Sequence, residues 1–261
     1  MYFKKTIINI SIIIFIVYIL FGIFLFFLQK SLLYYPDNQN FYQCKGFKNY
    51  QKLEFKGTRF YFLQGDPNKI IVYYHGNAGS ACDRSYFKSV FEKSNASLIF
   101  VEYAGYSNDK KSPSKNLILK DVENIQNYIN NKGYEKVIIY GQSIGSGAAS
   151  YHAFLGNVDD LILVSPFSKL KDVVQSKYIF YPVFILLKEK YDNIKWLKNY
   201  KGSLLIVHGD QDFIIPHKFS KKLFNSIENK NKDYVLIEEK GHNNIWSSLL
   251  FHNTISNYIK K

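Results

Sequence analysis

The amino-acid sequence predicts an α/β fold in which a mostly parallel sheet has helices on both faces. Short apolar runs alternate with helix-length amphipathic segments, and such alternation is typical of parallel sheets. From residue 70 onward the apolar runs lack the polar alternation of a half-exposed strand, so both of their faces should be covered. The first two runs flank Gly57 and Thr58, which favours an antiparallel hairpin. The predicted strands are Lys52–Phe55, Arg59–Leu63, Ile70–Tyr74, Ser97–Glu102, Lys136–Tyr140, Leu161–Val164, Leu204–Val207 and Tyr234–Glu238.

The segments between these runs have the length and apolar spacing of amphipathic helices. One connection, Ser168–Tyr200, is too long for a simple crossover and contains an apolar stretch around Pro182. We interpret residues 168–200 as a small cap on a single domain that covers residues 51–261. The predicted helices are Asp83–Ser94, Lys115–Asn131, Ile144–Leu155, His217–Asn229 and Ile245–Ile259.

The N-terminal region has the features of a membrane anchor. No charged residue occurs from Thr6 to Gln29. The run 7–28 would span roughly 33 Å as a helix, about one hydrocarbon core. It lacks the small-residue cleavage site of a signal peptide, so we expect an uncleaved signal anchor after a short tail, residues 1–6. Residues 29–50 then form a linker.

Positive charges are nearly balanced on the two sides of this run, so they give little information on orientation. Because a very short tail precedes a long domain, we expect the domain on the non-cytoplasmic side of the membrane.

The formal charge is +13, from 34 Lys and Arg against 21 Asp and Glu. The positive side chains are scattered, and only Arg59 and Arg84 are arginine, the residue that phosphate recognition favours. We therefore expect no nucleic-acid partner. The two cysteines, Cys44 and Cys82, belong to no Cys/His cluster, which argues against a metal site. Whether they pair is left open by the sequence.

The most informative motif is Gly141-Gln142-Ser143-Ile144-Gly145, which follows a predicted strand and precedes a predicted helix rich in small residues. This setting is that of a nucleophile elbow, a tight turn that exposes a serine hydroxyl at the top of a sheet. The alternative, a phosphate-binding helix start, is disfavoured because no Gly-Lys-Ser or Gly-Lys-Thr follows. Ser143 is the candidate nucleophile.

A serine nucleophile needs a base and an orienting acid. Among six histidines, His242 lies in the loop after the last predicted strand, at an edge where α/β sheets bind ligands. Asp212, which follows the seventh strand and precedes Pro216, is the candidate acid. Asp210 is the alternative acid, or it braces the loop.

The transition state of acyl transfer also needs donors for an oxyanion. The backbone N–H of Ile144, directly after the nucleophile, is one candidate. The glycine-rich loop His75-Gly76-Asn77-Ala78-Gly79 supplies the other, and we assign the N–H of Asn77. His75 itself is interpreted as a structural brace of that loop.

Together these motifs resemble the serine-aminopeptidase-like α/β hydrolases. Within that group the sequence is similar to membrane-anchored members, which include bacterial single-pass hydrolases and eukaryotic depalmitoylases. Leu33-Tyr34-Tyr35-Pro36-Asp37 adds to the resemblance, which extends from Ser31 to the C-terminus. One departure is Glu102-Tyr103-Ala104-Gly105-Tyr106-Ser107, because the family often has Asp at its start and Gly at its end.

The resemblance implies an α/β-hydrolase fold and a Ser143-His242-Asp212 triad that needs no cofactor. We expect a serine hydrolase of esters or thioesters, acting on acyl lipids or acylated proteins. An aminopeptidase or amidase would use the same residues. A non-catalytic binding protein on this fold remains the third interpretation, although such proteins usually lose a member of the triad.

Overall fold

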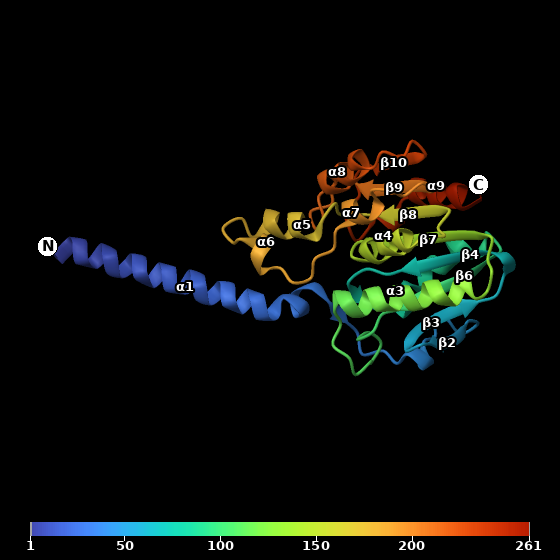
Figure 1. Ribbon diagram of the computed structural model, residues 1–261, viewed down its shortest axis with the longest axis horizontal. Coiled ribbons are helices and arrows are strands. Elements are labelled where there is room, and N and C mark those ends of the chain that lie inside the picture. Colours follow the sequence, from blue (N-terminus) through green and yellow to red (C-terminus); the bar gives the residue numbers. More distant parts are fainter. Residues whose placement is uncertain (1, 261) are drawn as a thin grey trace.

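The computed structural model describes residues 2–260 and shows a central sheet covered by helices, with one long helix projecting away from it (Figure 1). The eight-stranded sheet has the order β10-β9-β8-β7-β4-β6-β3-β2, and its strands are parallel except for the antiparallel pairings of β3 with β2 and β6. The predicted fold class is therefore confirmed. The strands are β2 (Gln51–Phe55), β3 (Thr58–Leu63), β4 (Asp66–Tyr74), β6 (Ala96–Glu102), β7 (Lys136–Gln142), β8 (Asp160–Val164), β9 (Ser203–Gly209) and β10 (Lys232–Ile237).

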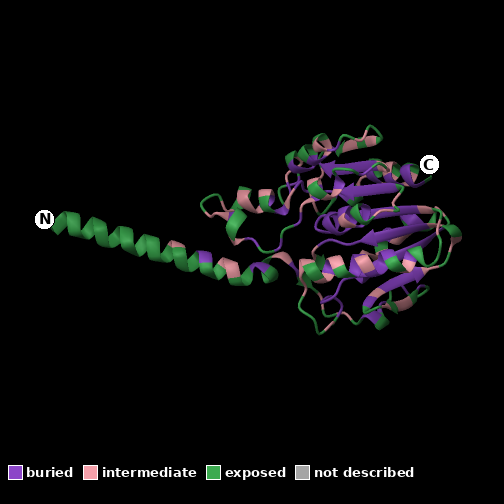
Figure 2. Ribbon diagram, in the orientation of Figure 1, coloured by how far each residue is buried: buried purple, intermediate pink, exposed green. Residues whose placement is uncertain are grey.

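Two clusters of buried side chains form the core on the two faces of this sheet, and most of its strands are buried (purple in Figure 2). Strand β4 alternates between the two layers, with Ile70 and Val72 in one cluster and Ile71 and Tyr73 in the other. Helices α3 (Lys115–Asn130), α4 (Gly145–Leu155) and α8 (Lys218–Ser226) contribute to the first layer. Helices α2 (Lys88–Glu92) and α9 (Leu249–Lys260) contribute to the second. Double coverage explains why the buried parts of β4, β6, β7, β8 and β9 are mostly apolar.

Two segments that were each predicted as one continuous helix are divided into two shorter helices in the structure. The segment predicted as one helix over 83–94 consists of a 3₁₀ helix, η2 (Cys82–Phe87), followed by α2. Its start is held in a tight turn, in which the Asp83 carboxylate accepts the Ser80 N–H at 3.2 Å. The helix predicted over 245–259 is interrupted at Ser248, which is extended and whose hydroxyl accepts the N–H of Phe251. Ser248 thus caps α9 after η3 (Ile245–Ser247).

Helix α1 (Tyr2–Leu33) is longer than the predicted span at both ends. Residues 2–6, predicted as a tail, form its first turns, and Met1 lies outside the described residues. Within residues 2–260 it is the one helix long and apolar enough to cross a bilayer. Most of its side chains are exposed (green in Figure 2).

The predicted linker 29–50 is largely part of the domain. Strand β1 (Tyr35–Pro36) pairs in parallel with β5 (Ala78–Gly79). Beyond it, the short 3₁₀ helix η1 (Phe41–Gln43) and the residues that follow bury Phe41 and Phe47 in the second core layer. Cys44 and Cys82 form a disulfide, with 5.9 Å between their Cα atoms, which closes the question that the sequence left open.

The connection between β8 and β9 contains three short helices, α5 (Leu170–Lys177), α6 (Val183–Leu186) and α7 (Asn193–Leu197). Helices α5 and α6 lie outside the sheet, on the side from which α1 projects (Figure 1). The side chain of Tyr181, between α5 and α6, stacks on Tyr18 of α1 with 4.6 Å between ring centroids. The region predicted as a cap therefore contacts the N-terminal helix.

Candidate active site

The site begins at the turn between β7 and α4. Ser143 occupies this turn with a φ of 55°, in the left-handed region that non-glycine residues rarely adopt. Its N–H donates to the Val164 carbonyl at 2.9 Å, which holds the turn against β8. A Cβ on Gly141 would lie 2.5 Å from the Ala149 side chain, and one on Gly145 would lie 2.4 Å from the Tyr74 carbonyl oxygen. Both glycines are therefore required for the close approach of α4 to the sheet.

A continuous chain of hydrogen bonds joins the three residues predicted as a triad. The Ser143 hydroxyl lies 2.9 Å from Nε2 of His242, and Nδ1 of His242 lies 2.7 Å from Oδ2 of Asp212. Because a carboxylate only accepts, Nδ1 carries the proton and Nε2 accepts the serine hydroxyl. The structure thus brings together side chains from three separate loops at the carboxyl edge of the sheet.

Asp212 is buried and surrounded by donors. Its Oδ1 accepts the N–H groups of Ile214 at 2.9 Å and Ile215 at 2.8 Å, and its Oδ2 also accepts from Nε2 of His208 at 3.1 Å. Burial alone would raise the pKa of this carboxyl, but the hydrogen bonds from His208, His242 and Ile215 hold it well below its usual value. The carboxylate is therefore ionised at neutral pH.

Asp210, the alternative acid, has different contacts. Its carboxylate accepts the N–H of Lys240 at 3.3 Å, and its carbonyl oxygen lies 3.3 Å from Nδ1 of His217. The bond from Lys240 joins the loop after β9 to the loop that carries His242, and the contact with His217 lies within the connection from β9 to α8. Asp210 therefore braces the loop after β9, which also contains Asp212.

The two predicted oxyanion donors face the same space as the serine. Asn77 and Ile144 both line the cavity that contains Ser143. Within residues 2–260, neither backbone N–H donates a hydrogen bond to another protein group. The Asn77 carbonyl, in contrast, accepts from the Tyr35 N–H at 3.0 Å and from the Tyr106 hydroxyl at 2.8 Å. These two bonds fix the orientation of the loop peptide.

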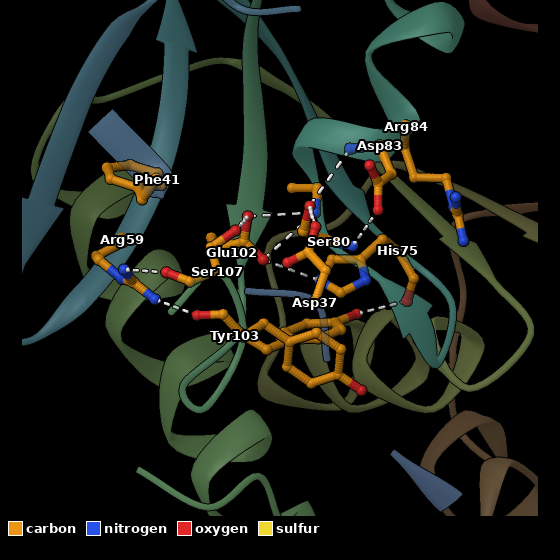
Figure 3. Close-up of polar contacts among 12 residues, drawn as sticks. Asp37, Phe41, Arg59, His75, Ser80, Asp83, Arg84, Glu102, Tyr103 and Ser107 are labelled. Carbon is orange, nitrogen blue, oxygen red and sulfur yellow. Dashed lines mark hydrogen bonds and ion pairs between the residues drawn. The ribbon is translucent and has the colours of Figure 1, made fainter. Parts of the chain in front are cut away.

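His75 is fully buried beneath this loop (Figure 3). Its Nδ1 donates to the Gly76 carbonyl at 2.7 Å, its ring lies 4.0 Å from that of Tyr103, and its Nε2 is 3.6 Å from the Glu102 carboxylate. The Tyr103 hydroxyl donates to the His75 carbonyl at 2.9 Å. His75 supports the backbone of the loop and has no contact with Ser143 among its hydrogen bonds in the described residues.

The departure from the family pattern at residues 102–107 has a local explanation. Ser107 has a φ of 46°, the left-handed conformation that a glycine would adopt easily. Its hydroxyl donates to the Glu102 carboxylate at 2.8 Å, and the same carboxylate accepts the Ala81 N–H (Figure 3). The hydroxyl of Ser107 thus satisfies a buried acidic group that has few other partners.

A cavity of about 500 Å³, here called the Ser143 pocket, extends from the serine between α1 and the cap. Its walls are mostly apolar and come from segments far apart in the sequence. Helix α1 contributes Leu25, Phe26, Gln29, Leu32 and Leu33, and the region 167–187 contributes Phe167, Leu170, Val173, Val174, Lys177, Tyr178, Tyr181, Val183, Leu186 and Leu187.

Sequence reasoning missed two positioning residues. His208, one residue before the end of β9, donates from Nε2 to the Ile215 carbonyl at 2.8 Å as well as to Asp212. Tyr34, in the short linker motif, donates its buried hydroxyl to the Glu189 carboxylate at 2.6 Å. The position of His208, two residues before Asp210, was the one sequence feature that could have indicated its role. No such feature indicated the role of Tyr34, because its partner Glu189 is 155 residues away.

Comparison with known proteins supports the α/β-hydrolase fold. Residues 61–178 match the family described as an alpha/beta hydrolase of unknown function, DUF1057. Uncharacterized protein R595 of Acanthamoeba polyphaga mimivirus is 31% identical over 69% of this chain and 68% of its own length. Lysophosphatidylserine lipase ABHD12 of Gallus gallus is 27% identical over 62% of this chain and 48% of its own length.

Among solved structures, the Pyrococcus furiosus esterase Pf2001 superposes with a TM-score of 0.70 at 12% identity, over 87% of this chain and 98% of the esterase. At this identity the likeness concerns the fold. The fold, the elbow and the matched family define a hydrolase-type α/β protein. The chain belongs to the α/β-hydrolase family.

The elbow geometry predicts that Gly145→Ala destabilises the protein. The new methyl group would lie 2.4 Å from the backbone oxygens of Tyr74 and His75, which cannot move without shifting β4. Overpacking of this kind costs about 1–3 kcal/mol, measurable by denaturant unfolding in detergent. Gly76→Ala is the matched control, since its Cβ would meet its nearest neighbour at an ordinary 3.7 Å. Equal losses in the two variants would contradict the explanation.

Proposed function

We propose that the protein is a serine hydrolase that cleaves carboxylic esters or thioesters through an acyl-enzyme. The observation that carries the proposal is the hydrogen-bonded chain from Ser143 through His242 to Asp212. In this proposal Ser143 is the nucleophile, His242 the general base and Asp212 the residue that orients it.

The reaction follows from the protonation states. The Ser143 oxygen attacks the substrate carbonyl carbon while its proton passes to Nε2 of His242. The ionised Asp212 stabilises the imidazolium and keeps its ring in place. The backbone N–H groups of Asn77 and Ile144 bind the developing oxyanion. His242 then gives its proton to the leaving group, and a water molecule repeats the sequence to release the acid.

The Ser143 pocket supports an acyl-lipid or acylated-protein substrate, because its walls are apolar and long enough to surround an acyl chain. The name of the ABHD12 relative, a lysophosphatidylserine lipase, points in the same direction. We further propose that α1 is an uncleaved membrane anchor and that the domain lies on the non-cytoplasmic side. The α1 span, residues 7–28, would then hold the pocket next to the lipid.

An aminopeptidase would need an acidic group to bind the substrate ammonium. The described residues that line the Ser143 pocket include Lys177 but no Asp or Glu. This lining disfavours the aminopeptidase alternative. A non-catalytic binding role is disfavoured by the intact hydrogen-bond chain.

Ser143→Ala should abolish turnover, because no other hydroxyl occupies the elbow. In comparable triads the loss is on the order of 10⁴–10⁶-fold. Hydrolysis of a short nitrophenyl ester and labelling by a fluorophosphonate probe provide the measurements. Ser226→Ala, on the distant helix α8, is the control and should retain both. Labelling or turnover retained by Ser143→Ala would refute the assignment.

Asp212→Asn and Asp210→Asn form a matched pair on one loop. Loss of the carboxylate at 212 should lower kcat by about 10³–10⁴-fold, as when the imidazole loses its orienting acid. The change at 210 removes a charge but keeps an acceptor for the Lys240 N–H, so kcat should change by about twofold or less. If the two variants exchanged these effects, Asp210 would be the acid.

The apolar walls predict a preference for longer acyl chains. Each added CH₂ that becomes buried should contribute up to about 0.8 kcal/mol of binding. In a series of esters with acyl chains from two to eight carbons, kcat/KM should rise several-fold and then level off. A flat or falling profile would rule out the long-chain substrate while leaving the serine mechanism in place.

A further inference from the structure

The cap contains a charge-free stretch, Tyr178–Leu187, that lies between Lys177 and Lys188. Although it belongs to a folded region, this stretch leaves large apolar side chains uncovered. Four of them are more than half exposed: Ile179 at 66%, Phe180 at 80%, Phe184 at 63% and Ile185 at 65%. None of these four lines the Ser143 pocket. Contiguous exposed apolar groups of this size mark a surface that meets a partner.

The stretch is attached to the side of α1 well inside its apolar part. The Tyr181 hydroxyl donates to the Tyr18 carbonyl at 3.0 Å, and the Tyr18 hydroxyl donates to the Phe180 carbonyl at 2.7 Å. Gly22 allows the contact, since a Cβ there would lie 3.0 Å from the Tyr181 ring. The cap and α1 therefore pack together where α1 is uncharged.

A second attachment lies where the apolar run of α1 ends. The Lys188 N–H donates to Oε1 of Gln29 at 2.7 Å, and Nζ of Lys188 is 3.8 Å from the centroid of the Phe26 ring. Tyr18 lies about three helical turns before Gln29, roughly 16 Å along the axis. If α1 crosses the bilayer, the Tyr18–Tyr181 contact is about halfway through a hydrocarbon core of about 30 Å.

Part of the irregular backbone of this stretch is bonded by the side chain of Gln175. Nε2 of Gln175 donates to the carbonyls of Tyr178 at 3.1 Å and Tyr181 at 3.0 Å, and its Oε1 accepts the Val183 N–H at 3.3 Å. Non-helical backbone is tolerated at membrane depth only where the protein itself satisfies it.

From these contacts we infer that Tyr178–Leu187 is embedded in the hydrocarbon of the bilayer beside α1, with lipid acyl chains as the partner of its exposed face. The inference rests on the proposed membrane span of α1. Lys177 and Lys188 then lie at the ends of the embedded stretch, where lysines extend to the polar interface.

Embedding would also place a second cavity, next to the Ser143 pocket, in the lipid. This cavity of about 500 Å³ lies along α1 from Tyr18 to Phe27 and is lined on the cap side by Tyr181, Pro182 and Leu186. It shares Phe26, Tyr181 and Leu186 with the Ser143 pocket. The two cavities therefore adjoin at these three side chains, on the face of α1 that the cap contacts.

The test is depth-dependent fluorescence quenching of the full-length protein in phosphatidylcholine vesicles. An environment-sensitive probe is attached to a cysteine in three separate variants, Phe184→Cys, Phe15→Cys and Phe154→Cys, with the native disulfide left oxidised. Phe15 on α1 and Phe154 near the end of α4 are, like Phe184, exposed phenylalanines, at 64% and 55%. Phe154 is the matched control because α4 returns from the elbow toward the far edge of the sheet. Unfolding midpoints establish that each labelled variant is folded.

We expect lipids brominated along the acyl chain to quench the probe at 184 about as strongly as that at 15, and to leave that at 154 unquenched. Quenching at 15 but not at 184 would overturn the inference and leave the proposed enzyme intact. A probe at 184 that is shielded from both lipid and aqueous quenchers would indicate a second copy of the chain there, and would also overturn it. Because quenching needs no turnover, failure of the proposed hydrolase activity would be seen separately, in the ester assays.

Discussion

Helix α4 packs closely against β7 and β4. Positions 141 and 145, two residues before and after Ser143, therefore have room only for glycine. The approach forces Ser143 into a left-handed backbone, and this strain is sustained because the β8 hydrogen bond and the buried start of α4 hold both ends of the turn. The hydroxyl is consequently held at the carboxyl edge of the sheet, next to the loops after β9 and β10. The fixed Ser143 oxygen is the reference point for the rest of the site. His242 bonds to it, Asp212 orients His242, and the Ile144 N–H lies next to it in the chain.

The short motif Leu33-Tyr34-Tyr35-Pro36-Asp37 bonds to two parts of the molecule that are far apart in the sequence, the cap and the loop region 77–80. Tyr34 bonds to Glu189 of the cap, Tyr35 donates its N–H to the Asn77 carbonyl, and Asp37 accepts the hydroxyl of Ser80. The end of α1 is thereby fixed both to the cap and to the loop that presents the Asn77 N–H. A shift of α1 relative to the sheet would disturb that loop, so α1 and the candidate site are mechanically connected.

Sequence reasoning succeeded where one physical requirement dominates. Doubly covered strands must be apolar throughout, so Ile70–Tyr74 and Lys136–Tyr140 were recognisable, and an elbow must place glycines around its serine. Prediction from the sequence failed where the structure depends on a weak local contact, or on a contact between residues far apart in the sequence. The interruption at Ser248 is a capping preference that competes with an apolar helix pattern, and the 3₁₀ start near Asp83 depends on one turn. His208 resembles any strand-end histidine until Asp212 and Ile215 fold around it. The partner of Tyr34 and the pairing of Cys44 with Cys82 are tertiary facts that no local pattern encodes.

A pocket whose walls come from two elements exists only while those elements are docked. The Ser143 pocket takes one wall from α1, through Leu25, Phe26 and Leu33, and the opposite wall from the cap. The hydrogen bonds that join the two involve only a few side chains, among them Gln29 and Tyr181, and most of the remaining contact is apolar. In water such a contact would be held by the hydrophobic effect, whereas in hydrocarbon that force vanishes and the paired hydrogen bonds and ring stacking must hold it. Tyr18 donates its hydroxyl to the Phe180 carbonyl, accepts the Tyr181 hydroxyl at its own carbonyl, and stacks on the Tyr181 ring. Such paired bonds are what contact within hydrocarbon would require. Helix α1 is therefore a structural part of the Ser143 pocket.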